Sequence, residues 1–402
     1  MKVLLVGSGG REHGLAWKLG QSPLLDELHA APGNPGIARL GDCHPVHAED
    51  GEGLLALASE LGVDLAVIGP EAPLVAGVAD DLRRAGIAVF GPSGAASRIE
   101  GSKIFAKEVM HAAGVPTAET LSVARPPCVI KADGLAAGKG VFVCHNQPAL
   151  DQALRAVTGD FVIEELLEGE EVSLFVVADG ERALPLAPAR DYKRAFDGDR
   201  GPNTGGMGAY SPVPAMGEAE LGDLVACIHL PVLRELASRG TPFVGLLYAG
   251  LMLTEDGPHV LEFNCRFGDP ETQAILPRLE GDLLEGLAAA AAGDVSGVEL
   301  AASDRAAVTV VLAAGGYPDG RDAGSPIEGV EAAEELGALV FHAGTALREN
   351  ELVTSGGRIL NVTGVADDAA EARALAYRAA DRISFSGAWY RRDIAEQTVA
   401  RV

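Results

Sequence analysis

The chain has 402 residues, 48% of them hydrophobic, which is enough for two or three domains with sizeable cores. Its net charge of −25 at pH 7 argues against nucleic acid or an anionic membrane as a partner, because both attract basic surfaces. A phosphorylated ligand would therefore have to be held by local basic side chains and backbone N–H groups.

The five cysteines are scattered along the chain and form no Cys-x-x-Cys pair. This spacing predicts free thiols in a reducing compartment rather than a disulfide framework or a structural zinc site. The first residues hold a single lysine and too few apolar residues for a secretory signal, and no apolar run reaches membrane-spanning length. We therefore expect a cytoplasmic protein.

The N-terminal part alternates short apolar strands with helical segments. Residues 2–6 predict a buried strand, a helix follows, and residues 63–69 and 87–91 predict two further strands. This alternation predicts a parallel, Rossmann-like α/β domain over residues 1–101. The loops "GSGG", "GPEAP" and "GPSG" would lie at the carboxyl edge of its sheet, where such sheets bind ligands.

The first of these loops, "GSGGREH", is close to a dinucleotide-binding turn. Gly7 and Gly9 fit its first two glycines, but Glu12 occupies the third place, and no acid follows where a ribose-binding acid belongs. NAD is therefore a poor fit. The turn could still bind an anion through its N–H groups, with Arg11 on a phosphate and Glu12 on an amine or a sugar hydroxyl. The alternative, two solvated residues in the first turn of a helix, stays open.

Two segments in the middle of the chain favour a nucleotide. "VIKADGLAAGKGVFV" (residues 129–143) predicts two antiparallel strands around a glycine-rich loop, with Lys131 and Lys139 placed for phosphate oxygens. "VIEELLEGEE" (residues 162–171) predicts a strand that runs into an acidic connection, suited to a ribose diol and an adenine amino group. On its own, the second segment is equally well explained as an exposed acidic turn.

"VLEFNCRFGDPETQ" is the most specific piece of the sequence. On a strand, Glu262, Asn264 and Arg266 would share one face, because side chains alternate. A carboxylate beside an amide oxygen suits Mg²⁺, and the neighbouring arginine could stabilise a transferring phosphoryl group. The alternative is a half-exposed strand that carries these polar groups by accident.

Together these pieces resemble the ATP-grasp superfamily, whose members join a carboxylate to an amine through an acyl phosphate. The wider set, which includes "GSGGREH", "GPNTGGMGAYSP", "EFNCRFGDPETQ", "FHAGT" and "YRRDI", is similar in order to the phosphoribosylamine–glycine ligase family across residues 7–394. The resemblance implies a multidomain α/β and α+β fold. We expect an N-terminal α/β domain (1–101), an ATP-grasp domain (102–312) with a lid at about 117–185, and a small C-terminal α+β domain (313–402).

The resemblance also implies a reaction. Glycine carboxylate would attack the γ-phosphate of ATP to give glycyl phosphate, and 5-phosphoribosylamine would displace the phosphate to give glycinamide ribonucleotide for purine biosynthesis. No enzyme nucleophile is needed, so catalysis would consist of positioning and charge stabilisation. A closing lid would protect the acyl phosphate from water. The resemblance further implies ATP with Mg²⁺ or Mn²⁺ as cofactors and favours a monomer.

The resemblance assigns roles to individual residues. Arg266 and Lys131 would be catalytic, and Glu262 and Asn264 would hold the metal. ATP would be bound by Lys103, Lys131, Gly138, Lys139, Gly140, Glu164, Leu167 and Glu171. Glycine and phosphoribosylamine would be bound by Gly9, Arg11, Glu12, Glu71, Asp191, Lys193, Asn203, Thr204, Gly205, Gly206 and Asp269.

The chain departs from the family pattern at three places. Tyr192 in "RDYKR" replaces a usual histidine, so that histidine cannot be essential for proton transfer here. The segment between "GVFV" and "FVIEE" is shorter than is common, which predicts a smaller lid. The strand before "LEFN" reads "YAGLM" and lacks the metal-binding acid of many ATP-grasp enzymes, which favours one protein-held metal ion.

Two rival functions are compatible with part of this pattern. Another ATP-grasp carboxylate ligase would share the central motifs but would not combine "GPNTGGMG" with "GSGGREH". A nucleotide-binding regulatory module without turnover would not need the arginine at position 266. An oxidoreductase is a more distant third, for the reasons given at Glu12.

Overall fold

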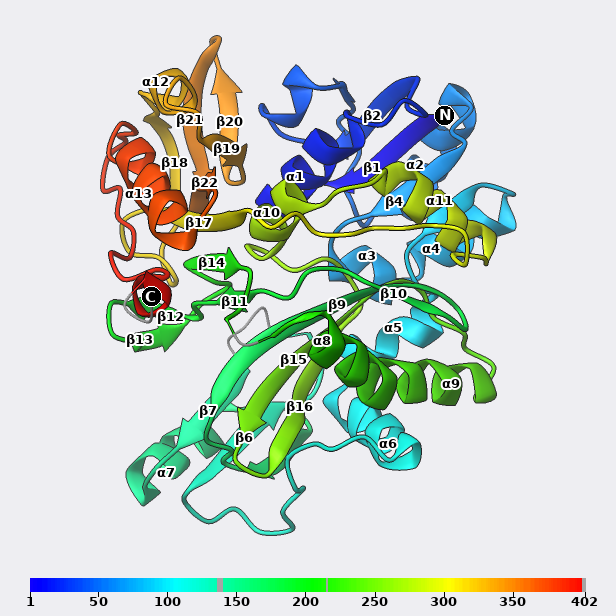
Figure 1. Ribbon diagram of the computed structural model, residues 1–402, viewed down its shortest axis with the longest axis vertical. Coiled ribbons are helices and arrows are strands. Elements are labelled where there is room, and N and C mark those ends of the chain that lie inside the picture. The colour runs from blue at the N-terminus through cyan, green and yellow to red at the C-terminus, as the bar shows by residue number, and fades with distance from the viewer. Residues whose placement is uncertain (136–139, 215, 400–402) are drawn as a thin grey trace.

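The computed structural model describes residues 1–135, 140–214 and 216–399, and Figure 1 shows their arrangement. An N-terminal α/β domain (blue) lies beside a C-terminal domain (orange and red), and most of the middle of the chain (cyan to green) lies below both. The predicted loop residues Gly138 and Lys139 fall outside the described residues. In the described part of the chain, no helix is both long and apolar enough to cross a membrane.

The N-terminal domain is the predicted parallel α/β unit. Its five strands are all parallel in the order β3-β2-β1-β4-β5, so the strand order reverses between β1 and β4. A ligand site is expected at the carboxyl edge at this point. The strands are β1 (Lys2–Gly7), β2 (Glu27–Pro32), β3 (Asp42–Cys43), β4 (Leu65–Ile68) and β5 (Ala88–Phe90). The helices are α1 (Gly10–Leu19), α2 (Gly51–Leu61), α3 (Glu71–Val75), α4 (Val78–Arg84) and α5 (Gly94–Gly101).

The middle of the chain forms two antiparallel sheets. A four-stranded sheet has the order β10-β9-β15-β16, and a three-stranded sheet has the order β7-β6-β8 with its own small core. The strands of the first are β9 (Glu170–Asp179), β10 (Ala183–Pro185), β15 (Val244–Thr254) and β16 (Gly257–Asn264). Those of the second are β6 (Cys128–Ala132), β7 (Val141–Cys144) and β8 (Phe161–Glu165). The helices of this part are α6 (Lys103–Ala113), α7 (Gln147–Ala156), α8 (Glu218–Leu224), α9 (Leu230–Ser238), α10 (Thr272–Ile275) and α11 (Leu283–Ala292).

The helix predicted at about 217–239 is interrupted by a π-helical segment, Val225–His229. The cause is Pro231, which lies in the first turn of α9. Proline has no backbone N–H to donate, and its ring clashes with the carbonyl four residues earlier. The wider π turn relieves this clash and lets the helix continue as α9.

The C-terminal domain is built on a sheet that includes strands from earlier in the chain. The order is β11-β14-β17-β22-β19, and β17 pairs antiparallel with both β14 and β22. These strands are β11 (Arg190–Asp191), β14 (Gly208–Ser211), β17 (Ala306–Ala313), β19 (Leu339–His342) and β22 (Arg358–Ala366). Its remaining elements are β18 (Asp322–Pro326), β20 (Thr345–Arg348), β21 (Glu351–Gly356), α12 (Val330–Glu334), α13 (Ala369–Ala380) and α14 (Glu396–Val399). A separate hairpin, β12 (Arg194–Phe196) and β13 (Arg200–Asn203), lies between β11 and β14.

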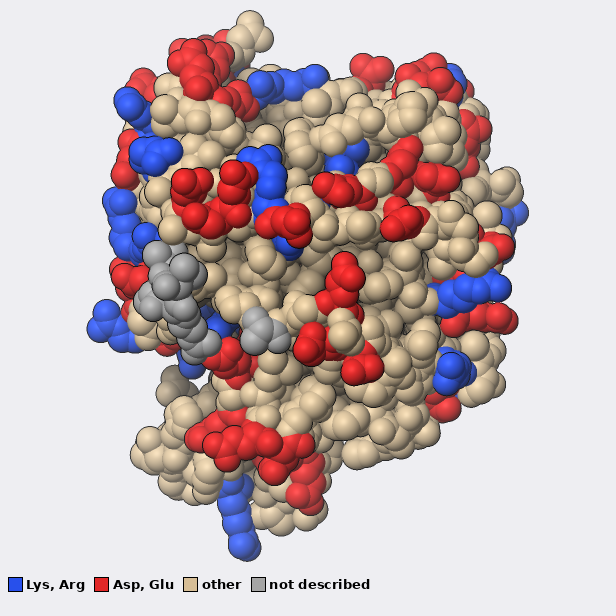
Figure 2. Space-filling view, in the orientation of Figure 1, with Lys and Arg blue, Asp and Glu red and all other residues tan. Residues whose placement is uncertain are grey.

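The surface reflects the acidic composition. Figure 2 shows one face of the molecule, on which acidic side chains outnumber basic ones. This face therefore offers no continuous basic surface to an anionic ligand.

Candidate active site

A cavity of about 1280 Å³ lies where the three parts of the chain meet. It is lined by the β1–α1 turn, by α6, β6 and β16, by the loops between β11 and β14, and by turns of the C-terminal domain. The predicted residues that line it are Gly9, Arg11, Glu71, Lys103, Lys131, Gly140, Glu164, Leu167, Glu171, Asp191, Lys193, Asn203, Thr204, Gly205, Glu262, Asn264, Arg266 and Asp269. The lining does not include Glu12 and Gly206.

One wall of the cavity carries two lysines that share a buried carboxylate. Lys131 Nζ lies 2.6 Å from Glu164 Oε2 and donates to the carbonyl oxygen of Leu261 at 2.8 Å. Lys107 Nζ lies 2.8 Å from Glu164 Oε1. All three side chains are less than a tenth exposed. The group therefore carries one net positive charge at a place with little water, which suits an anionic ligand.

Lys107 was not predicted as a site residue, although its position carried a signal. It follows Lys103 by four residues on α6, so both side chains lie on one face of the helix. Burial lowers the pKa of Lys107, and Glu164 opposes this effect. The lining also has an apolar portion, called the apolar wall below, formed by Ala106, Met110, Val129, Leu261 and Phe263.

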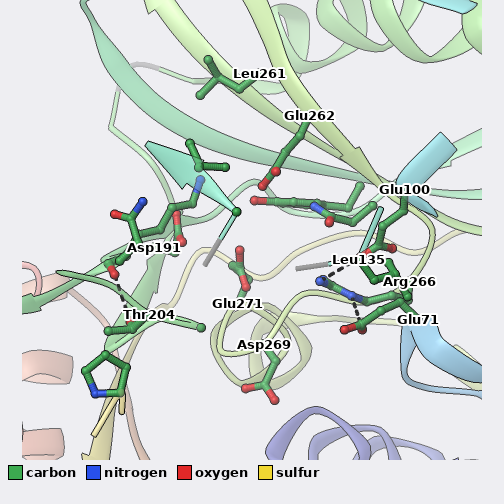
Figure 3. Close-up of a pocket in the computed structure, with 18 of the residues that line it drawn as sticks. Glu71, Glu100, Leu135, Asp191, Thr204, Leu261, Glu262, Arg266, Asp269 and Glu271 are labelled. Atoms are coloured by element: carbon green, nitrogen blue, oxygen red, sulfur yellow. Dashed lines mark hydrogen bonds and ion pairs between the residues drawn. The ribbon is translucent and has the colours of Figure 1, made fainter. Parts of the chain in front are cut away.

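Glu262 and Asn264 project from β16 into the cavity. Burial alone would raise the pKa of Glu262, but the charges of Lys193 and Lys131 outweigh this effect. The pKa is therefore lower than usual, and the carboxylate is ionised. Figure 3 shows the carboxylates of Glu262 and Glu271 directed into the same part of the cavity. Within the described ranges, no three His, Cys, Asp or Glu side chains are grouped closely enough to hold a metal ion. The donor set of one carboxylate and one amide therefore fits a hard cation that takes its remaining oxygens from a ligand.

Arg266 lies just beyond the end of β16, between two carboxylates (Figure 3). Its Nε is 3.1 Å from Glu71 Oε2, and its Nη2 is 3.2 Å from Glu100 Oε1. The second oxygen of Glu100 accepts a hydrogen bond of 2.7 Å from the backbone N–H of Cys265. Burial raises the pKa of Glu71, but Arg266 and Arg11 lower it to about 2 overall. Glu100 was not predicted, because no motif marks an acid at the end of α5.

The carboxylate of Glu12 is already bound within the β1–α1 turn. Its Oε2 accepts the backbone N–H of Gly9 at 2.6 Å, and its Oε1 lies 2.6 Å from Nε of Arg11. The side chain is 2% exposed. A Cβ added at Gly7 would lie 2.6 Å from Glu12 Cγ, and one added at Gly69 would lie 2.2 Å from Glu12 Oε1. Glu12 therefore fills the space under the turn, which explains why a third glycine is not needed there.

Asp191 and Lys193 line the part of the cavity near the carboxylates of Glu171 and Glu262. Lys193 Nζ lies 2.8 Å from Glu171 Oε2. Lys193 and the hydrogen bond that it makes lower the pKa of Glu171. Burial raises the pKa of Asp191 to about 7, against the effect of Lys193. The backbone N–H of Thr204 donates to the carbonyl oxygen of Lys193 at 2.8 Å, which closes the loop that carries both residues.

The C-terminal domain supplies part of the cavity lining. The sequence alone did not show whether this domain contacts the site. Arg358 Nη2 lies 3.2 Å from Asp269 Oδ2, and its Nη1 donates to the backbone carbonyl oxygen of Asp269 at 2.8 Å. The N–H of Gly205 donates to the hydroxyl of Tyr317 at 3.1 Å. The "GGYP" and "TSGGR" turns therefore complete the side of the cavity opposite the lysines.

Comparison with known proteins gives a consistent result along the whole chain. Three models of phosphoribosylglycinamide synthetase match: the N domain at residues 1–100, the ATP-grasp (A) domain at 101–272 and the C domain at 307–397. Phosphoribosylamine–glycine ligase of Agrobacterium fabrum is 50% identical, covering 100% of this chain and 99% of the relative. That of Streptomyces coelicolor is 51% identical, covering 98% and 99%.

Solved structures agree. The crystal structure of phosphoribosylamine–glycine ligase from Thermotoga maritima superimposes with a TM-score of 0.85 at 35% identity, covering 98% of this chain and 100% of that one. A biotin carboxylase domain of 2-oxoglutarate carboxylase from Hydrogenobacter thermophilus has a TM-score of 0.70 at 18% identity, which shows a shared fold alone. The chain therefore belongs to the phosphoribosylamine–glycine ligase family, with the N-terminal, ATP-grasp and C-terminal domains of that family.

Proposed function

We propose that the protein ligates glycine to 5-phosphoribosylamine at the expense of ATP, through glycyl phosphate, giving glycinamide ribonucleotide, ADP and phosphate. The observation that carries this proposal is the placement of Arg266. It lies in one cavity with the Lys107–Glu164–Lys131 group and with the β1–α1 turn. A phosphoryl donor, a carboxylate and a sugar phosphate can therefore meet without leaving the cavity. Family membership supports the same reaction.

The nucleotide would occupy the side of the cavity formed by α6, β6 and β8. Lys103, Lys131 and Gly140 would contact its phosphates, the apolar wall and Leu167 would contact adenine, and Glu171 would contact the ribose. Both oxygens of Glu164 are bound by lysines. We propose that Glu164 orients Lys131 rather than binding adenine itself.

The substrates would occupy the opposite side. Gly9, Arg11 and Glu71 would bind the phosphoribosylamine, and Asp191, Lys193, Asp269 and the loop Asn203–Gly205 would complete this side. Arg266 is held between Glu71 and Glu100, so its guanidinium is already oriented for a phosphoryl group and for the carboxylate of glycine. Because the cavity lies between three domains, bound substrates would be shielded from the water that hydrolyses acyl phosphates.

A divalent ion bound with ATP would neutralise phosphate charge. Glu262 and Asn264 would hold it, and Mg²⁺ or Mn²⁺ would suit their oxygen atoms. We further propose a cytoplasmic enzyme, since all five cysteines are free. The expectations of a monomer, and of no nucleic acid or membrane partner, remain predictions.

The test is release of ADP with MgATP, glycine and phosphoribosylamine generated in situ, with each omitted in turn. Release that requires all three supports the ligase. Release that continues with a different carboxylate but without glycine points to another ATP-grasp ligase. Binding of ATP without release under any condition points to a nucleotide-binding regulator and contradicts the proposal.

A further inference from the structure

Residues 391–395, which precede α14 and are called the tail below, contact the β12–β13 hairpin (residues 194–203). The first residue of the tail, Arg391, is 1% exposed. Its Nη1 donates to the carbonyl oxygen of Arg194 and to Oδ1 of Asp199, both at 2.9 Å. Its Nη2 lies 2.6 Å from Asp393 Oδ2. One guanidinium therefore joins the first strand of the hairpin and the turn that follows it to the tail.

Two further contacts hold the hairpin against the tail, and two more are made by Tyr192, which precedes the hairpin. The N–H of Arg392 donates to Oδ1 of Asp197, and the N–H of Gly198 donates to Oδ2 of Asp393, both at 2.8 Å. These two contacts fix the tip of the hairpin. Next to its base, the hydroxyl of Tyr192 accepts the N–H of Ala395 at 2.9 Å. The ring of Tyr192 also lies 4.8 Å from the guanidinium carbon of Arg391, a cation–π contact.

The residues at the base of the hairpin belong to the active-site cavity. Lys193 precedes the first strand, and Asn203, Thr204 and Gly205 lie at and beyond the end of the second. The hydrogen bond from the N–H of Thr204 to the carbonyl oxygen of Lys193 joins the two ends of the hairpin. The tip is held by the tail and the base lines the cavity, so the hairpin connects the tail to the site.

We propose that Arg391 is a positioning residue for the reaction. Through the tail it holds the β12–β13 hairpin so that Lys193 and Asn203–Gly205 face the substrates. This inference rests on the proposed function for its kinetic consequence. It also gives Tyr192 a use, as the residue that attaches the base of the hairpin to the tail. Arg391 itself does not line the cavity.

Two aspartates make a matched test. Asp199 and Asp381 are 59% and 55% exposed, and each pairs with an arginine of the tail, at 2.9 Å and 3.1 Å. Asp199 lies on the hairpin, whereas Asp381 lies next to the end of α13. Asp199→Asn would loosen the hairpin, whereas Asp381→Asn would remove a comparable ion pair that joins the tail to the end of α13 and not to the hairpin. Arg391→Lys keeps the charge but loses the planar fork, so it should have a larger effect than Asp199→Asn.

We expect Asp199→Asn to raise the KM values for glycine and phosphoribosylamine by roughly tenfold, because a small displacement of a positioning group has large kinetic effects. The KM for ATP should change less, since its phosphate wall lies on α6 and β6. Asp381→Asn should behave as wild type. A purely structural role would reduce the amount of folded enzyme, and hence the apparent kcat, while leaving each KM unchanged.

Limited trypsin digestion gives a second readout that does not depend on the reaction. Cleavage after Arg194 or Arg200 in the hairpin should be faster in Asp199→Asn than in Asp381→Asn, at equal thermal midpoints. Unchanged KM values in both Asp199→Asn and Arg391→Lys would overturn the proposal, even with faster cleavage. If wild type itself fails to turn over, the proposed function is wrong. Faster cleavage in Asp199→Asn alone would then still support the attachment of hairpin to tail.

Discussion

Glu100 Oε1 lies 3.2 Å from Nη2 of Arg266, and this ion pair connects α5 of the N-terminal domain to the segment after β16. The other oxygen of Glu100 accepts the N–H of Cys265. One buried carboxylate thus fixes both the side chain of Arg266 and the backbone that precedes it. Arg266 was predicted from its motif, but the group that orients it comes from a distant part of the sequence.

Replacing Glu100 by glutamine should lower turnover more than ATP binding. Glu100→Gln retains an acceptor for the backbone of Cys265 but removes the charge that holds Arg266. We expect kcat for ADP release to fall by roughly tenfold to a hundredfold, since Arg266 would be less well placed. ATP affinity, measured by calorimetry, should stay near wild type. The exposed Glu108→Gln on α6 serves as the control, and wild-type turnover in Glu100→Gln would contradict the prediction.

Lys107→Met should destabilise the protein. Glu164 would lose one of its two buried cations, and a charge-assisted hydrogen bond of this kind contributes about 2 kcal/mol. The measurement is the free energy of unfolding in urea. Lys2→Met removes an ion pair with Glu27 whose side chains are 39% and 48% exposed, so its effect should stay below about 1 kcal/mol. Equal losses of unfolding free energy in the two variants would contradict the prediction, because the buried carboxylate would then contribute no more than an exposed ion pair.

The contact between the N-terminal and C-terminal domains should weaken in acid because of a buried histidine. His13 Nδ1 accepts the N–H of His342 at 2.8 Å. Burial, with His342 beside it, lowers the pKa of His13 to about 3. In the unfolded chain the pKa is near 6.5, so below that pH the unfolded state binds one proton more than the folded state. The stability contributed by neutral His13 is therefore complete above pH 6.5 and decreases as the pH falls toward 3.

At pH 5 this loss should reach about 2 kcal/mol relative to pH 8. His13→Asn keeps an acceptor for His342 without a group that titrates in this range. We expect the difference in unfolding free energy between pH 8 and pH 5 to be smaller in His13→Asn than in wild type. The same difference in both proteins would mean that His13 is not responsible.

Glu262→Gln should weaken the response to Mg²⁺. The substitution leaves the shape of β16 but removes the one negative charge that the Glu262–Asn264 pair offers. We expect the Mg²⁺ concentration for half-maximal ADP release to rise by at least roughly tenfold. Asp256→Asn, at the exposed turn before β16, provides the control. An unchanged Mg²⁺ requirement in Glu262→Gln would remove Glu262 from the proposed metal ligands.

The sequence predicted those strands and turns that are determined by the pattern of residues within a short segment. The buried β1, the turn at Gly9 and the β6–β7 hairpin around Lys131 follow from composition and alternation over a few residues. The same is true of Glu262 and Asn264 on β16, whereas Arg266 lies beyond the end of the strand on which it was predicted. The family resemblance then added the domain layout. Resemblance, however, assigns roles only to positions that belong to known motifs.

The contacts that depend on distant parts of the chain were not predicted. Glu100 pairs with a residue 166 positions later, and Tyr192 is bonded to Ala395, 203 positions away. Such pairs arise from how the domains pack, so no local periodicity records them. Glu12 illustrates the same limit, because its type suggested a ligand contact but its neighbours bind both of its oxygens.

The sheet of the C-terminal domain has a consequence for attempts to dissect the protein. β14 precedes β17 by almost a hundred residues, yet its four residues pair with β17 along their whole length. A fragment that stops before residue 306 would leave β14 with an open edge of N–H and C=O groups, a template for aggregation. We therefore expect the segments matched by the three family models to aggregate when they are expressed separately. A split version of this enzyme would need its break in a surface connection that crosses no sheet, with the two pieces produced together.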